Sequence, residues 1–150
     1  MDNERIREIC LGLPHVAESF AWGHHLLFWV GDKAIGGKMF AVIDVDGTGD
    51  GVLSFHCGAE RFHELVEMDG VIPAPYSARN FWVLVERWDA MRARQYEAEL
   101  RLAHGLIYDK LPKRTKTILA MPEKERAGIV RERKKLLEEK EARKKGGGAA

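Results

Sequence analysis

The sequence predicts an α+β fold, in which helices pack on one face of an antiparallel sheet and a basic helical extension follows. Two observations predict this class. Three short runs rich in aromatic and branched residues follow one another between Leu26 and Cys57, separated only by Gly- and Asp-rich links. The helical patterns do not alternate with the strands, which disfavours a parallel doubly wound sheet. The chain of 150 residues has the length of one ordinary domain.

The first half of the chain contains one helix and three strands. Apolar residues recur at helical spacing between Ile6 and Leu13, and Pro14 ends this short helix. Three apolar runs then predict strands over residues 26–30, 39–45 and 52–57. The Gly- and Asp-rich segment 46–51 predicts a hairpin between the second and third strands.

The second half of the body returns to helices around one further strand. Apolar spacing predicts a helix over residues 59–68. Two prolines predict a loop over residues 70–77, and the run at 80–86 predicts a strand. Asp89 can cap a long helix whose apolar face continues to Leu111.

Charge and aromatic content divide the chain after Pro112. Residues 1–112 hold 11 Lys and Arg against 17 Asp and Glu, a net charge of −6. Residues 113–150 hold 13 against 6, a net charge of +7. All thirteen aromatic residues lie in the first part, and a segment without them cannot build its own core. We therefore predict a domain over 1–112 and a basic helical tail over 113–150 with a flexible Gly/Ala end.

The tail contains the strongest electrostatic signal in the sequence. Pro122 followed by two glutamates predicts a helix over residues 122–144, with basic residues concentrated toward its C-terminal end. Such a helix can act as an electrostatic arm for phosphate backbones. The alternative is a solvated helix whose glutamates offset half of the charge. For the first interpretation, the predicted DNA contacts in the tail are Lys113, Arg114, Lys116, Arg131, Arg133, Lys134 and Lys135.

Apolar residues of the tail offer a different role. Ile129, Val130, Leu136 and Leu137 repeat after seven residues, over too short a stretch to predict a coiled coil. They can dock on the body, on a second copy of the chain or on a protein partner.

Composition also limits the compartment. No apolar run approaches the roughly 20 residues of a membrane span. The first five residues contain no apolar segment typical of a secretory signal. Two cysteines, Cys10 and Cys57, give no disulfide framework. These features predict a cytoplasmic protein without a membrane association.

Metal-binding patterns in the sequence are incomplete. Asp46, Thr48 and Asp50 match the first half of a calcium loop, but its twelfth position is Cys57 where a bidentate Glu is required. A Gly-rich hairpin is therefore the favoured interpretation. For zinc, the possible donors lack the paired spacing of known sites; they are His56, Cys57 and His63, with His24 and His25. We predict neither a metal nor a cofactor.

Catalytic patterns are equally sparse. Cys57 falls inside a predicted strand, which is not the setting of a reactive thiol. Ser19, Ser54 and Ser77 lack a Gly-x-Ser-x-Gly frame, and no Gly-rich phosphate loop precedes a helix. The sequence therefore predicts a protein that is not an enzyme.

Four stretches, in order and spacing, resemble the MmcQ/YjbR family of small bacterial proteins. They are LPHVAESF at 13–20 with Gly23 following, GKMFA at 37–41, RNFW at 79–82 and YDKLPK at 108–113. The resemblance covers roughly residues 5–114. It implies an α+β fold similar to bacterial frataxin (CyaY) and the DNA-binding role usually attached to the family. Two departures stand out: Phe81 replaces a His, and the gap 31–37 is longer than the usual tight turn, so this hairpin is expected to protrude.

The body adds three predicted contacts to those of the tail. Exposed aromatics beside basic residues on a sheet can stack nucleic-acid bases. Trp82 shares one strand face with Leu84, and Arg79 nearby matches the family pattern. With Lys38, these residues are the predicted body contacts, although packing in the core is the commoner role of aromatics.

The predicted function is therefore non-enzymatic DNA binding, mainly through phosphates. The alternative is a protein-interaction or small-ligand-binding module, in which the sheet face binds a peptide or metabolite.

Overall fold

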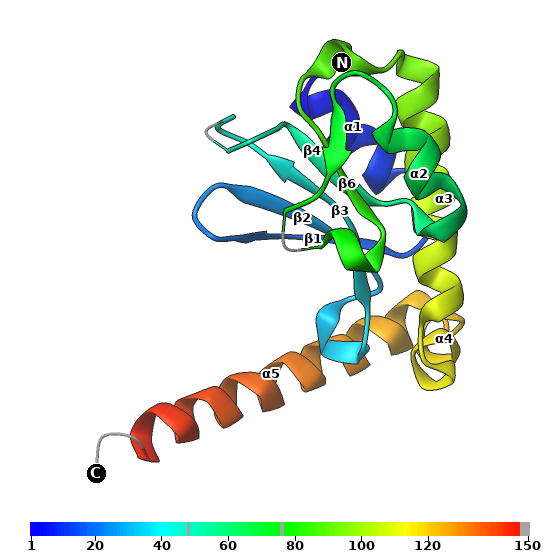
Figure 1. Ribbon diagram of the computed structural model, residues 1–150. Coiled ribbons are helices and arrows are strands. Elements are labelled where there is room, and N and C mark those ends of the chain that lie inside the picture. Colours follow the sequence, from blue (N-terminus) through cyan, green and yellow to red (C-terminus); the bar gives the residue numbers. More distant parts are fainter. Residues whose placement is uncertain (48, 76, 148–150) are drawn as a thin grey trace.

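The computed structural model describes residues 1–47, 49–75 and 77–147. An antiparallel sheet in the strand order β1-β2-β3-β4-β6-β5 forms its centre, which confirms the α+β class (Figure 1). The strands are β1 (Val16–Ala21), β2 (His25–Val30), β3 (Lys38–Asp44), β4 (Leu53–His56), β5 (Val71–Pro73) and β6 (Trp82–Val85).

Helices cover one face of this sheet. Those on this face are α1 (Asn3–Leu11), α2 (Gly58–Val66) and α3 (Ala93–Lys110). After them follow α4 (Lys113–Leu119) and α5 (Glu123–Gly147), and the 3-10 turns are η1 (Lys33–Ile35), η2 (Ala78–Asn80) and η3 (Trp88–Ala90). The long α3 lies against β2, β3 and β4, and α2 lies against β5 and β6. Figure 1 shows α1, α2 and α3 together on the same side. None of the described helices is both long and apolar enough to cross a membrane.

The core lies between the sheet and these helices. Strand alternation selects its members: Val83 and Val85 of β6 are buried beneath the helices, whereas Trp82 and Leu84 turn to the opposite face. The prediction that Trp82 and Leu84 share one face is thus confirmed. No helix of the described residues covers the opposite face of the sheet, and this is where the candidate site lies.

Two strands were not predicted from the sequence. Both β1 and β5 are edge strands, and the prediction of a loop over residues 70–77 is wrong over Val71–Pro73. Pro73 fits there because a proline on an edge strand can turn its missing N–H away from the ladder. In β1 the middle residues are exposed and partly polar, so no apolar run marks it.

The start of the long helix also differs from the prediction. Asp89 does not cap it: α3 begins at Ala93, with Arg92 in the N-cap position and Asp89 in η3. Asp89 instead pairs with Arg87, with 2.8 Å between Oδ1 and Nε. The two residues that separate η3 from α3 are extended at Met91 and Arg92, which places Asp89 too early to reach the first turn.

Packing continues past Pro112. Ile118 and Leu119 of α4 are buried in the same core as the sheet, and Thr115 Oγ1 donates a hydrogen bond of 2.7 Å to the carbonyl of Ile35. The segment that contains η1 extends beyond the sheet and meets α5 there (Figure 1). The predicted helix over 122–144 is confirmed as α5. The division at Pro112 stays a prediction about independent folding, and part of the predicted flexible end, residues 148–150, lies outside the described residues.

Candidate ligand site on the uncovered sheet face

The sheet face without helices carries a groove of about 710 Å³. Its apolar surface comes from Trp22 at the β1–β2 turn, Met39 and Val42 on β3, and Trp82 and Leu84 on β6. Trp82 and Leu84 lie on one face because side chains alternate along a strand. Met39 and Val42 are three residues apart and share this face because the register between β2 and β3 shifts between Phe28 and Trp29. The groove is therefore a direct product of the sheet register.

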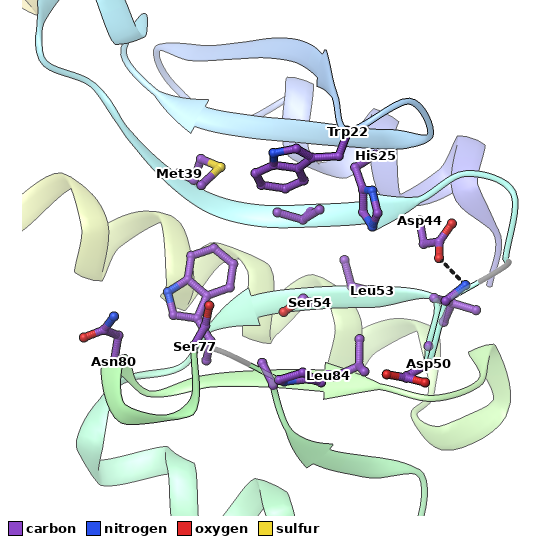
Figure 2. Close-up of a pocket in the computed structure, with 17 residues that line it drawn as sticks. Trp22, His25, Met39, Asp44, Asp50, Leu53, Ser54, Ser77, Asn80 and Leu84 are labelled. Atoms are coloured by element: carbon purple, nitrogen blue, oxygen red, sulfur yellow. Dashed lines mark hydrogen bonds between the residues drawn. The ribbon is translucent and has the colours of Figure 1, made fainter.

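Polar groups lie at the two ends of the groove. Figure 2 shows Ser77 and Asn80 at one end, near Met39, and Asp44 and Asp50 at the other. Among the described residues that line the groove, none is a lysine or an arginine. An apolar surface with a few polar groups at its ends is the common form of a small-ligand site.

Trp22 stands at the mouth of the groove in an unusual backbone conformation. Its φ of 56° and the φ of 78° at Gly23 place two consecutive residues of the turn in the left-handed region. This conformation is uncommon for a bulky residue and costs on the order of 1 kcal/mol. The indole is 65% exposed and meets the ring of His25 edge-on, with 5.5 Å between centroids. A strained, exposed tryptophan beside a groove points to a role in binding.

Asp44 organises the turn between β3 and β4. Its carboxylate accepts hydrogen bonds from the backbone N–H groups of Gly47 (3.1 Å) and Gly49 (2.7 Å), one on each oxygen. A Cβ at Gly49 would lie 2.5 Å from Asp44 Oδ2, so the small residue is needed there. The described part of segment 46–51 is thus a Gly-rich hairpin turn; Thr48 lies outside the described residues.

The side chains considered as metal donors separate in the structure. His24 and His25 lie at the β1–β2 turn and meet Asp44, which the sequence did not connect with them. Figure 2 shows His25 pointing into the groove beside Asp44. The other three donors, His56, Cys57 and His63, do not join this cluster.

His56 and Cys57 are buried in separate hydrogen bonds. His56 Nε2 accepts from Lys110 Nζ at 3.1 Å, and burial, followed by the charge of Lys110, lowers the pKa of His56. Cys57 Sγ donates to the carbonyl of Phe81 at 3.2 Å, and burial raises the pKa of its thiol to about 11. A thiol that stays protonated is a poor nucleophile. His63 is exposed on α2.

The basic residues predicted to contact DNA do not form one surface. Those that line a hollow between α4 and α5 are Lys113, Arg114 and Arg133. Arg131 and Lys134 face the other side of α5, where Lys134 Nζ pairs with Asp32 at 3.0 Å. Lys135 is exposed. The tail thus presents its cations in two directions.

The predicted body contacts are also divided. Trp82 lines the groove, whereas Lys38 and Arg79 are exposed outside it. Of the predicted tail contacts, Lys116 donates to the carbonyl of Asp109 at 3.1 Å, which holds the lysine side chain on the end of α3. The groove therefore has the predicted stacking residue without the predicted cations.

The apolar residues of the tail helix split in the same way. Ile129 and Val130 are partly buried against the core. Leu136 is 54% exposed and Leu137 is 44% exposed. Toward its C-terminal end α5 projects away from the sheet (Figure 1). Docking on the body accounts for the first two residues only.

Trp22 and Asp44 were not predicted as site residues. Trp22 directly precedes Gly23, a pattern that could have indicated a hairpin turn with an exposed aromatic residue. The sequence did not reveal the first strand of that hairpin. The signal for Asp44 is its place as the last residue of a strand before a Gly-rich turn. Their proximity follows from strand register, which no single segment reveals.

Comparisons with known proteins agree with the resemblance seen in the sequence. A family model described as YjbR matches residues 11–106. The crystal structure of Deinococcus radiodurans protein DR2400, described with domain DUF419, is similar with a TM-score of 0.66 and 28% sequence identity. The match covers 79% of this chain and 87% of that chain. No curated protein matches the chain.

Proposed function

The chain belongs to the YjbR family, and from that premise we propose that it is a non-enzymatic binding protein whose uncovered sheet face holds a small planar ligand. The observation that carries the proposal is the groove between Trp22 and Trp82. Its volume falls within the roughly 300–1,000 Å³ of typical small-ligand sites. Indole rings contribute a flat apolar surface that favours planar ligands.

The charges around the groove select the ligand further. Asp44 and Asp50 line one end, and the described lining residues include neither lysine nor arginine. A low-dielectric groove with carboxylates favours cations and disfavours phosphates. We therefore expect an uncharged or cationic ligand.

The absence of catalysis and the cytoplasmic location are parts of the same proposal. Burial raises the pKa of the Cys10 thiol to about 12 and that of Cys57 to about 11, which keeps both thiols protonated near neutral pH. Both cysteines are free and buried, as is common in proteins of a reducing compartment.

Dye binding tests the groove directly. Thioflavin T, a planar cation, is titrated into the full chain and compared with anilinonaphthalene sulfonate, an anionic dye. We expect the cation to bind more tightly. We also expect Trp22→Ala or Trp82→Ala to weaken its binding about fivefold, since one aromatic contact contributes on the order of 1 kcal/mol. Trp88→Phe, which alters an indole outside the groove, is the control. Unchanged dye affinity in both alanine variants contradicts the proposal.

DNA binding is a second candidate function, supported by one observation. Lys113, Arg114 and Arg133 come from two helices and surround a single hollow. Three convergent cations can hold a phosphate backbone without reading its bases. Glu132 lines the same hollow and reduces its potential. In this candidate α4 and α5 contact DNA, and the sheet groove takes no part.

A salt series distinguishes this candidate from a general polycation. Anisotropy of labelled duplex and single-stranded DNA is measured with the full chain, with Lys113→Ala/Arg114→Ala/Arg133→Ala, and with Lys140→Ala/Arg143→Ala/Lys144→Ala. Loss of three phosphate contacts lowers the salt slope by about 2 to 3. The candidate predicts this loss for the first triple variant only. An equal loss in the second assigns binding to the tail as a whole.

A protein partner, or a second copy of the chain, is the remaining alternative. It is supported by the exposure of Leu136 and Leu137 on the projecting part of α5. Leu137→Ser is expected to weaken any self-association seen by sedimentation, while dye and DNA affinities stay unchanged, because Leu137 lines neither the groove nor the hollow between α4 and α5.

A further inference from the structure

Three metal-ligating side chains converge at one end of the groove. A ring nitrogen of His24, a ring nitrogen of His25 and a carboxylate oxygen of Asp44 all lie within 4.8 Å of one another. Strand register brings them together: His25 at the start of β2 is directly opposite Asp44 at the end of β3. Val45 N donates to the carbonyl of His24 at 2.9 Å and closes the same end. The convergence thus rests on the sheet itself.

Burial makes this cluster different from a surface group of polar residues. Asp44 is only 8% exposed, and both imidazoles are half-buried. Nδ1 of His25 is buried and has no hydrogen-bond partner among the described residues. A buried nitrogen without a partner is destabilising, because it has lost its hydrogen bonds to water. Either ring nitrogen of a histidine can ligate a metal, so a bound ion would remove part of this cost.

The carboxylate of Asp44 is held in place before any ion arrives. The N–H groups of Gly47 and Gly49 each bind one of its oxygens, and each oxygen keeps a further lone pair. Hydrogen bonds of this kind orient the ligands in known metal sites. Asp50 adds a second negative charge at the same end of the groove (Figure 2).

The donor set selects the metal. Two imidazoles and one carboxylate suit zinc and neighbouring first-row metals, whereas calcium and magnesium prefer sites made of oxygen atoms. With metal–ligand bonds of about 2.1 Å, the ligand atoms would lie about 3.3 Å from one another. Rotation of the two half-buried imidazoles can shorten the present distances to this value. Three protein ligands leave at least one coordination position for water or another ligand.

We infer that His24, His25 and Asp44 bind one divalent transition-metal ion of the zinc class at the end of the sheet groove. The inference goes beyond the proposed function. Metal binding requires these three side chains, whether or not the groove between Trp22 and Trp82 holds a ligand.

Metal titration of the full chain, freed of metal with a chelator and carrying no polyhistidine tag, is the test. Zn²⁺ binding is measured by calorimetry, and Co²⁺ binding by its visible absorption, which reports nitrogen and oxygen ligands. We expect one ion per chain. In known metal sites, loss of a residue that hydrogen-bonds to a metal ligand lowers metal affinity by about 10- to 100-fold. Loss of a ligand itself, in His24→Gln or His25→Gln, is therefore expected to lower Zn²⁺ affinity by at least about tenfold. His63→Gln, at an exposed histidine on α2, is the control.

Two results would overturn the inference. One is the lack of saturable binding of either ion at one equivalent. The other is equal affinity in the wild-type chain, His24→Gln and His25→Gln, which would place the ion elsewhere. Thermal melting shows which variants fold, and His24→Gln, at the turn, decides the result if His25→Gln does not fold. Trp82→Ala keeps metal affinity while it weakens dye binding, so a failure of one proposal is distinguishable from a failure of the other.

Discussion

At the residue scale, Gly37 has the least room for a side chain among the described glycines. A Cβ there would lie 1.8 Å from the carbonyl oxygen of Gly31, a backbone atom that cannot rotate away. Gly128 in α5 is the opposite case, because its Cβ would meet nothing within 4 Å. The two glycines therefore have different reasons to be in the sequence.

Alanine at these two glycines is expected to change stability in opposite directions. Gly37→Ala forces the backbone between β2 and β3 apart and lowers the free energy of unfolding by about 2 to 4 kcal/mol. Gly128→Ala raises it by up to about 1 kcal/mol, since alanine favours a helix interior. Urea unfolding of both variants measures the difference. A Gly37→Ala protein as stable as the wild type contradicts the close approach.

His56 gives the fold a dependence on pH. Burial and the neighbouring Lys110 lower the pKa of His56 in the folded state below its ordinary value of 6.5. The unfolded chain then binds more protons than the folded one below that value, so this contribution to stability is complete above about pH 6.5 and is lost as the pH falls. The pKa of His15 is also lowered, mainly by burial, so His15 likewise makes the fold less stable as the pH falls.

Urea unfolding at pH 5.0 and pH 7.5 tests this linkage. We expect the wild type to lose more stability at the lower pH than His56→Gln, whose side chain still accepts from Lys110 but does not titrate. His63→Gln is the control, with the wild-type dependence. An identical loss in His56→Gln would assign the linkage to other groups.

At the element scale, α2 and α3 are joined by an ion pair between Arg61 and Glu99. Glu99 on α3 is buried, and its Oε2 has no partner among the described residues, so the carboxylate depends on the guanidinium. Arg61 is 32% exposed in its side chain and also pairs with Glu64 at 3.0 Å. A buried charge with one partner is sensitive to the loss of that partner.

Removal of Arg61 is expected to loosen this helix pair. Arg61→Ala lowers the free energy of unfolding by about 2 to 3 kcal/mol, less than for a fully buried pair because solvent screens the exposed guanidinium. Arg101→Ala breaks the surface pair with Glu97 and changes stability by less than about 0.5 kcal/mol. Urea unfolding compares the two. Recovery of stability in Arg61→Met/Glu99→Met shows that the unpaired carboxylate causes the loss.

The elements that could be predicted from the sequence are those marked by a run or a regular spacing of apolar residues. β2, β3 and β6 are mainly apolar runs, β4 alternates apolar and polar residues, and α3 has a long apolar stripe. β1 was missed because its exposed positions carry Glu18 and Ser19, and β5 because Pro73 is typical of a loop. Part of the groove could be predicted from the sequence, because Trp82 and Leu84 are two residues apart on one strand and so share a face. The approach of His25 to Asp44 could not be predicted, because it depends on register between strands.

At the scale of the whole molecule, the core crosses the charge boundary. Ile118 and Leu119 belong to the core, with Leu119 beside Gly31, although both follow Pro112 in the basic segment. Composition separates a basic tail from an acidic body, yet the beginning of that tail is attached to the body by these two apolar residues and by the hydrogen bond from Thr115 to Ile35.

Truncation tests this attachment. A chain that ends at Pro112 loses two buried aliphatic side chains and is expected to be less stable by about 3 to 5 kcal/mol. A chain that ends at Lys135 keeps them, together with the pair between Lys134 and Asp32, and stays within about 0.5 kcal/mol of the full chain. Thermal and urea unfolding compare the two lengths. Equal stability at both lengths would support an independent domain over 1–112.

The projecting end of α5 changes how the molecule rotates in solution. Leu136 still lines the hollow against α4, and residues 137–147 continue the helix past it by roughly 16 Å at 1.5 Å per residue. Such a particle tumbles anisotropically, and reorientation of its long axis is the slowest motion. Amide N–H vectors in α5 lie along that axis, so their nitrogen-15 relaxation would report a longer correlation time than that of vectors across the sheet.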